Sequence, residues 1–240
     1  MSQVIADRLK QIRDTIATAC ARAHRPEKSV QIIVVTKTAP LDAVKAVIRL
    51  GCTELGENRT QHLKQIAEEI DAFLTENADD PAVPNEVHWH MIGHLQRNKV
   101  KPTLKICRII HSVDTLRLAE EINADAWKQG LHIDTLLQVN CSGEPQKYGI
   151  PVGAVLHLAE QISTLPNLRL VGLMTMAPLT MDKDRVRASF ARAREIYEDI
   201  RSEKIVGAKF KHLSMGMSQD YEIAIEEGAT LLRIGSALFS

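Results

Sequence analysis

A lysine lies two residues after the most apolar run of the chain. The run VQIIVV, residues 30–35, is rich in β-branched side chains, which is typical of a strand buried on both faces. Thr36 and Lys37 follow it, and a proline comes at position 40. A lysine there is paired, solvated at the strand end, or desolvated, and a desolvated amine has a lowered pKa and forms Schiff bases with aldehydes.

Small residues recur at the ends of the last two predicted strands, in the segments HLSMGMSQD and LLRIGSALF: Ser214, Gly216, Ser218, Gly235 and Ser236. In parallel barrels these two strand ends frequently bind phosphate through backbone N–H groups and small hydroxyls. Each glycine taken alone is better explained as a turn residue. The two together, on adjacent strands, favour a phosphate site.

A reactive lysine and a phosphate site on one barrel indicate an aldehyde that carries a phosphate. The vitamin B6 cofactor pyridoxal 5′-phosphate (PLP) is such a molecule. Arg233 is then the candidate partner of the pyridine nitrogen. Because arginine does not readily give up a proton, it would leave that nitrogen unprotonated and the ring a weaker electron sink. A structural salt bridge explains Arg233 equally well from spacing alone.

The elements that must position these residues alternate along the chain. Strand patterns are predicted at eight segments: 30–37, 52–58, 87–93, 108–113, 133–140, 168–176, 209–215 and 230–236. Helical patterns lie between them, and a further helix is predicted over 3–24. This alternation predicts one closed (β/α)8 barrel over residues 1–240. We expect the leading helix to fill the place of a missing helix after the eighth strand, and residues 71–86 to form a surface loop.

The composition is that of an ordinary globular protein, with 45% hydrophobic and 25% charged residues. Thirty basic and thirty acidic residues balance, which gives no indication of nucleic-acid binding or of a membrane surface. The four cysteines are far apart, and the N-terminus does not resemble a signal peptide. We therefore expect a cytoplasmic protein. A closed barrel needs no partner strand, so a monomer is predicted.

Seven blocks of the sequence resemble the pyridoxal phosphate homeostasis protein family, also described as alanine racemase N-terminal domain-like. They run in order from about residue 30 to the C-terminus: VVTKTAP, LGENRTQ, HWHMIGHLQRNKVK, SVDTLRLAEEIN, QVNCSGEPQKYGI, GLMTMAP and HLSMGMSQDYEIAIEEGATLLRIGSA. The resemblance implies a barrel of the fold-type III PLP class. It also implies a role in PLP homeostasis, as a carrier or buffer of the cofactor.

The resemblance also assigns site residues. It implies a Schiff base between PLP and Lys37, with Arg233 facing the pyridine nitrogen and Asn58 beside the ring. The phosphate contacts that it implies are Ser214, Met215, Gly216, Gly235 and Ser236. It places Lys147 in a loop at the barrel mouth. The sequence departs from the family's S-K-T-K-P pattern at Ala39, where the second lysine would stand.

The residues are also compatible with other functions. Racemisation needs a base on each face of the substrate, and none of Tyr148, Tyr197 and Tyr221 lies at a predicted strand end, so efficient racemase activity is not expected. A PLP-dependent racemase or lyase is the alternative, and a Schiff-base aldolase or a regulatory binding module are further ones. PLP-dependent apoenzymes are the partners that a carrier would serve. His88, His90 and His94 are interpreted as barrel residues and not as metal ligands.

Overall fold

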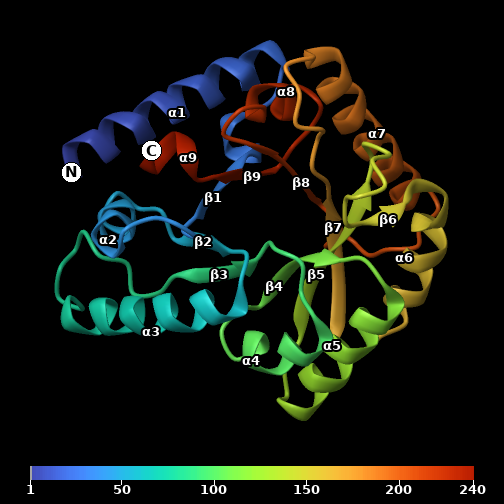
Figure 1. Cartoon of the computed structure of the whole chain (residues 1–240), viewed down its shortest axis with the longest axis horizontal. Coiled ribbons are helices and arrows are strands. Elements are labelled where there is room, and N and C mark those ends of the chain that lie inside the picture. The colour runs from blue at the N-terminus through green and yellow to red at the C-terminus, as the bar shows by residue number, and fades with distance from the viewer. Residues whose placement is uncertain (1) are drawn as a thin grey trace.

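Eight parallel strands close into a barrel in the computed structural model, which describes residues 2–240 (Figure 1). Each strand pairs with the next along the chain, and pairing between the first and last strands completes the circle. The strands are β1 (Gln31–Val35), β2 (Glu54–Glu57), β3 (His88–Met91), β4 (Ile109–Val113), β5 (Ile133–Asn140), β7 (Leu168–Met174), β8 (His212–Met217) and β9 (Leu231–Ile234). A two-residue strand, β6 (Ile150–Pro151), pairs only with β5. The predicted (β/α)8 barrel is confirmed.

Helices surround the barrel on its outside (Figure 1). They are α1 (Ser2–Arg22), α2 (Leu41–Arg49), α3 (Thr60–Glu76), α4 (Val100–Leu104), α5 (Leu116–Lys128), α6 (Val155–Ser163), α7 (Lys183–Ser202), α8 (Tyr221–Glu226) and α9 (Ser236–Phe239). Short 3-10 turns occupy Glu27–Ser29, Arg97–Lys99 and Val152–Ala154. The predicted leading helix is confirmed as α1, which packs against α2, α8 and α9.

Two expectations about these helices are wrong. A four-residue helix, α9, does follow the last strand, because the final residues turn back under α1 instead of ending in an extended tail. The predicted loop at 71–86 begins too early, since α3 continues to Glu76. Its apolar side chains Ile70 and Phe73 are buried, and this packing extends the helix into the acidic segment.

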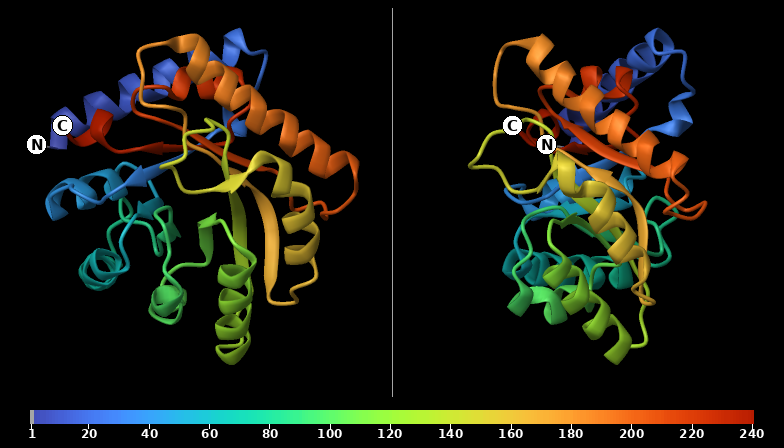
Figure 2. Two further views of the ribbon diagram at one scale, coloured as in Figure 1. Left: turned by 45° about the vertical axis from the view of Figure 1, so that its right-hand side comes forward. Right: turned by 90° about the vertical axis from the view of Figure 1, so that its right-hand side faces the viewer.

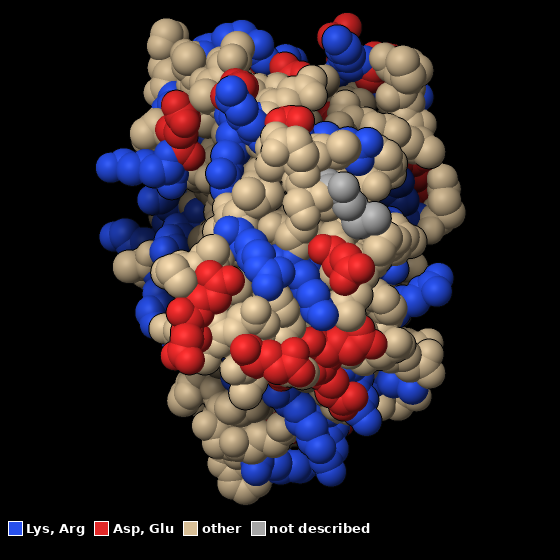
Figure 3. Space-filling view, turned by 90° about the vertical axis from the view of Figure 1, so that its left-hand side faces the viewer, with Lys and Arg blue, Asp and Glu red and all other residues tan. Residues whose placement is uncertain are grey.

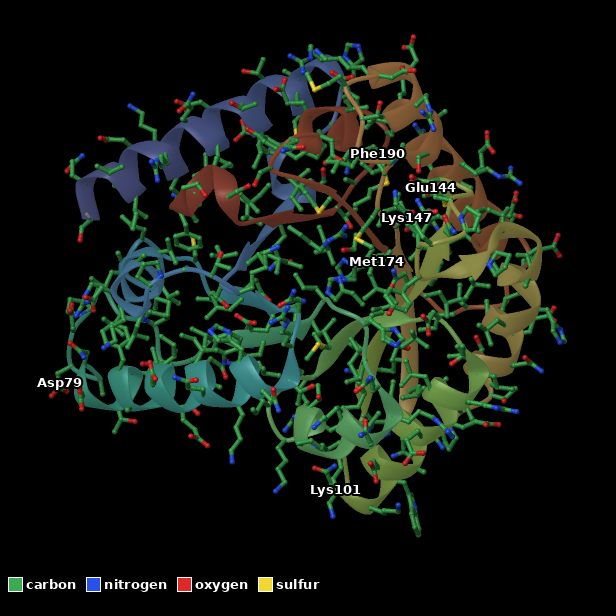
Figure 4. The ribbon with its side chains drawn as sticks, in the orientation of Figure 1. Asp79, Lys101, Glu144, Lys147, Met174 and Phe190 are labelled. Atoms are coloured by element: carbon green, nitrogen blue, oxygen red, sulfur yellow. The ribbon has the colours of Figure 1, made fainter. Side chains whose placement is uncertain are left out.

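The barrel has an inner and an outer apolar core. A small inner cluster contains Ile33, Leu136, Val171, Met174 and Leu231, and Met174 lies toward the barrel centre in Figure 4. The larger outer cluster fills the space between strands and helices. Successive residues of a strand point to opposite faces. Buried on both faces from Ile33 to Val35, β1 has to be apolar there, as the sequence predicts.

Strand β8 begins three residues later than predicted and ends two residues later. Its register against β9 shifts between Ser214 and Met217. Gly216 lies in that irregular stretch with a φ of +91°, a conformation that L side chains rarely adopt. A Cβ there would also lie 2.6 Å from the Cβ of Ala224. The glycine therefore permits the irregular backbone at the end of β8 and its close approach to α8, which sequence alternation does not reveal.

The arrangement of the helices places the chain ends close together and leaves charged side chains on the surface. The two termini lie side by side in both views of Figure 2. Basic and acidic side chains are interspersed on the face shown in Figure 3, in keeping with the balanced charge of the sequence. Within residues 2–240, no helix is both long and apolar enough to cross a membrane.

Replacing Phe190 by alanine should destabilise the fold by about 3–5 kcal/mol, because the ring is fully buried between α7 and the barrel and its loss leaves a cavity. Urea denaturation followed by circular dichroism measures this change. The control is Leu179→Ala, at a side chain that is 90% exposed, which should shift the free energy of unfolding by less than about 0.5 kcal/mol. Equal effects of the two variants would contradict the assignment of the outer core.

Candidate functional site

Arg233 is a buried charge inside the barrel. It lies on β9 and is 5% exposed. Its Nη1 donates to the carbonyl oxygen and to the hydroxyl oxygen of Ser214, each at 2.7 Å, and its Nη2 donates to the carbonyl oxygen of Thr175 at 2.9 Å. Burial lowers the pKa of the guanidinium to about 10, and the carboxylate of Asp220 opposes that shift. Arg233 therefore remains charged at neutral pH.

Hydrogen bonds continue from Arg233 across the barrel interior. The hydroxyl of Ser214 on β8 lies 2.9 Å from Nδ1 of His111 on β4. Nε2 of His111 lies 2.9 Å from Nδ1 of His90 on β3, and Nε2 of His90 lies 2.6 Å from a carboxylate oxygen of Glu54 on β2. We call these five residues the polar chain. It connects a guanidinium on the last strand to a carboxylate on the second.

One arrangement of protons satisfies every hydrogen bond of the polar chain. An arginine only donates, so the Ser214 oxygen accepts from it and the Ser214 hydroxyl donates to Nδ1 of His111. His111 then carries its proton on Nε2 and donates to His90, whose own Nε2–H donates to Glu54, a carboxylate that only accepts. Every hydrogen bond then runs in one direction, from Arg233 to Glu54.

Lys37 lies just beyond the end of β1, in a turn. Its side chain is exposed and makes no hydrogen bond or ion pair with residues 2–240. The preceding residue, Thr36, is fully buried and donates its hydroxyl to Glu57 at the end of β2. The second carboxylate oxygen of Glu57 is buried without a hydrogen-bond partner in the described residues. The amine of Lys37 is thus held at the barrel mouth by a rigid strand and is accessible to a ligand.

The ends of β8 and β9 meet beside β1. A Cβ on Gly235 would lie 3.2 Å from the carbonyl oxygen of Val35, which places the end of β9 against the end of β1. The backbone N–H of Ala237 donates to the hydroxyl of Ser218 at 3.0 Å, so this serine bridges the β8–α8 loop and the start of α9. Ser236 lies beside it in sequence at the start of α9. Small hydroxyls and backbone N–H groups of two strand ends are thereby gathered at one place.

Ser214 and Ser218 occupy different environments. Ser214, the predicted phosphate contact, is fully buried, and its hydroxyl is engaged by Arg233 and His111. Its neighbours Met215 and Gly216 are buried as well. Ser218 is partly exposed. Its loop is shaped by Asp220, which accepts from the N–H of Met217 at 2.6 Å, and burial raises the pKa of that aspartate.

Two loops shape the rest of the barrel mouth. Lys147 follows β5, forms an ion pair with Glu144 at 2.5 Å and donates to the carbonyl oxygen of Ala177 at 2.9 Å (Figure 4). The ring of Tyr148 stacks on His94, with centroids 4.1 Å apart and planes at 12°. Asn58, directly after β2, is half-buried. The loop that follows β5 and the loop that follows β7 project from the same end of the barrel (Figure 2).

The residues at the barrel mouth were predicted from the sequence more accurately than those in the barrel interior. Lys37, Arg233 and Ser236 lie at the C-terminal ends of adjacent strands, as expected. The polar chain was not predicted: His90 was interpreted as a barrel residue, and its contact with Glu54 was not foreseen. His111 was missed, although a histidine in the middle of the apolar run RIIHSV was a signal. No group of three or more His, Cys, Asp or Glu side chains in residues 2–240 is arranged to hold a metal ion.

Fold and site together define a class, the proteins built on the barrel of alanine racemase. The family model described as "Alanine racemase, N-terminal domain" matches residues 8–240. Within that class, the chain belongs to the pyridoxal phosphate homeostasis protein family. The protein of that name from Aquifex aeolicus is 36% identical over 233 residues, which are 97% of this chain and 96% of the relative.

Two solved structures have the same architecture. A protein from Bifidobacterium adolescentis, described as unknown, gives a TM-score of 0.91 at 34% identity over 99% of this chain and 95% of the other. PipY of Synechococcus elongatus, solved with PLP bound, gives a TM-score of 0.80 at 31% identity over 98% of this chain and all of the other. These levels of identity and coverage extend the family match over the whole barrel.

The polar chain makes stability depend on pH. Burial, with help from the nearby His90, Arg233 and His212, lowers the pKa of His111 well below its ordinary value of 6.5. In the unfolded chain His111 therefore binds a proton near pH 6.5, whereas in the folded protein it stays neutral at that pH. The His111 contribution to stability is fully present above that pH and decreases as the pH falls below it, by about 1.4 kcal/mol at one pH unit below 6.5. Burial lowers the pKa of His212 as well, so its effect has the same sign.

We therefore expect the free energy of unfolding to decrease between pH 7.5 and 5.5, and the decrease to be smaller in His111→Gln. Urea denaturation at several pH values measures the slope. His132→Gln, at an exposed histidine, is the control and should leave the slope unchanged. If His111→Gln does not fold, NMR titration of the wild-type imidazole decides, and an ordinary pKa for His111 would contradict the proton arrangement.

Proposed function

We propose that this protein binds PLP at the barrel mouth and serves PLP homeostasis as a carrier or buffer of the cofactor. The observation that carries the proposal is the buried guanidinium of Arg233. Its three hydrogen bonds use three of its five N–H groups, so two remain available in the described part of the chain. A buried charged donor is costly to leave without acceptors. A pyridine nitrogen is an acceptor that fits this position.

The other groups at the mouth fit the remaining parts of PLP. We propose that Lys37 forms a Schiff base with the aldehyde, which its exposure at the end of β1 supports. Asn58 lies beside the ring in this arrangement. Lys147 is an unsuitable first site for the aldehyde, because its amine is already engaged by Glu144 and the carbonyl oxygen of Ala177.

We propose Gly235, Ser236 and Ser218 as the phosphate contacts. The first N–H groups of a helix have no intrahelical partner and suit an anion, and Ser218 already lies within hydrogen-bond distance of the α9 backbone. Ser218 takes the place that the resemblance gave to Ser214, because the Ser214 hydroxyl is committed to the polar chain. Met215 and Gly216 then act through the backbone that leads to Ser218.

The same arginine argues against efficient turnover. PLP supplies an electron sink for amino-acid chemistry when its ring nitrogen is protonated. Arg233 stays charged at neutral pH, with a pKa of about 10, and it offers hydrogen bonds without giving up a proton. We therefore propose a protein that holds and releases PLP, with PLP-dependent apoenzymes as its recipients. A PLP-dependent racemase or lyase is the alternative, and turnover of alanine well above that by PLP alone would support it.

The barrel and the cysteines support proposals about the oligomeric state and the cellular compartment. The closed barrel has its eight main strands paired on both sides, so it offers no strand edge to a second copy, and we propose a monomer. The four cysteines are free, which suits a reducing compartment such as the cytoplasm.

Replacing Lys37 by alanine should abolish covalent PLP binding and leave the fold intact, because the side chain makes no contact that the core needs. The visible absorption of the purified protein, borohydride reduction and peptide mass mapping measure this. We expect the pyridoxyl mass on the peptide that contains Lys37. Lys147→Ala is the matched control and should keep the adduct. An adduct retained by the Lys37 variant and lost from the Lys147 variant would show that Lys147, and not Lys37, binds the aldehyde.

Serine-to-alanine variants separate the two candidate phosphate serines. Ser218→Ala should weaken PLP binding about tenfold and leave stability nearly unchanged, because one hydrogen bond to a charged group is lost at a partly exposed position. Ser214→Ala should cost about 1–3 kcal/mol of stability, because Arg233 and His111 each lose a buried partner. PLP titration and urea denaturation measure both effects. If Ser214→Ala weakened binding without changing stability, Ser214 would be the phosphate contact after all.

A further inference from the structure

A cavity of about 370 Å³ lies outside the barrel, between helix α7 and the segment that follows β5. Cys141 and Ser142 form one wall, and the α7 side chains Arg185, Ser189 and Arg192 form the other. None of these residues belongs to the proposed PLP site. The cavity is near the mouth loop that carries Glu144 and Lys147, which Figure 4 shows beside α7.

The lining of this cavity is positively charged. Arg185 and Arg192 are seven residues apart on α7, about two helical turns, so their side chains project from the same face. No carboxylate side chain lines the cavity. Arg185 forms no ion pair with residues 2–240. Arg192 pairs with Glu195 at 2.7 Å, but both side chains are about half exposed, and such surface pairs contribute little. An anion can therefore draw on both guanidiniums.

The neutral groups of the lining suit an anion as well. Burial raises the pKa of the Cys141 thiol to about 11, so the sulfur carries no negative charge at neutral pH. Ser189 is 4% exposed, and its hydroxyl is buried without a hydrogen-bond partner in the described residues. Buried hydroxyls are rarely left unpaired. The oxygen itself is covered, so Ser189 contributes a neutral wall beside the two guanidiniums.

We propose that this cavity binds the phosphate of a small phosphomonoester, at a second site separate from the barrel mouth. Two guanidiniums can each present a pair of N–H groups to the oxygens of a phosphate dianion, and arginine matches that geometry better than lysine does. The volume is near the lower end of the range for small-molecule sites, so one small metabolite fits. This inference does not depend on the proposed PLP site, because no residue is shared.

The test is a calorimetric titration with glycerol 3-phosphate. The protein is first saturated with PLP, and the excess is removed, so that the mouth site is occupied. We expect one saturable site in the wild type, and an affinity at least tenfold lower in the double variant Arg185→Gln/Arg192→Gln. Glycerol, which lacks the phosphate, should give no binding. Arg201→Gln is the matched control, because Arg201 lies on the same helix in a comparable exposed pair with Glu198.

The outcomes separate the two proposals. Visible absorption reports PLP loading, which should be equal in the wild type and in the double variant. If the protein does not load PLP, the proposed function fails, and the titration on the unloaded protein still tests the cavity through the loss in the double variant. The absence of a saturable site in the wild type, an equal affinity in the double variant, or an equal loss in the Arg201 variant would overturn the cavity proposal.

Discussion

The need to satisfy one buried charge organises the inside of this barrel. Arg233 reaches from the last strand to Ser214 and Thr175, and through Ser214 to His111, His90 and finally Glu54. A guanidinium in an apolar interior is strongly unfavourable unless hydrogen bonds surround it. The five side chains of the polar chain come from β2, β3, β4, β8 and β9, so the same bonds that solvate the arginine connect opposite sides of the barrel.

This interior arrangement has a consequence for the mouth. Ser214 and the carbonyl oxygen of Thr175 use three N–H groups of Arg233 and leave two for a ligand. The guanidinium is held from several directions, so it offers these donors without having to be ordered first. Binding then costs little conformational entropy. Lys37 is different, because its long side chain is exposed and forms no hydrogen bond or ion pair with residues 2–240. A guanidinium fixed by hydrogen bonds and an exposed amine suit the reversible PLP binding that we propose.

Arginines are also prominent on the outer surface near the mouth, on helix α7. On α7, Arg185 and Arg192 face a cavity with no carboxylate, while Arg187 on the same helix is bound by Glu226 and Glu227. The helix thus contains one arginine that is bound by two carboxylates of α8 and its C-terminal end, and two that line the cavity. The distinction depends on which side of α7 each residue occupies, because α8 covers only one side.

The sequence by itself determined the eight strands, the ring of helices and the residues at the strand ends, because period and residue type depend on local burial. It placed Lys37, Arg233, Gly235 and Ser236 correctly at the ends of neighbouring strands. Only the tertiary structure decided which polar side chains meet inside the barrel. Ser214 and Ser218 are four residues apart in one motif, yet one joins the polar chain and the other the α9 backbone. Gly216, between them, has a positive φ in the stretch where the strand register shifts. Contacts across a closed barrel join residues that are distant in sequence, and no local pattern records them.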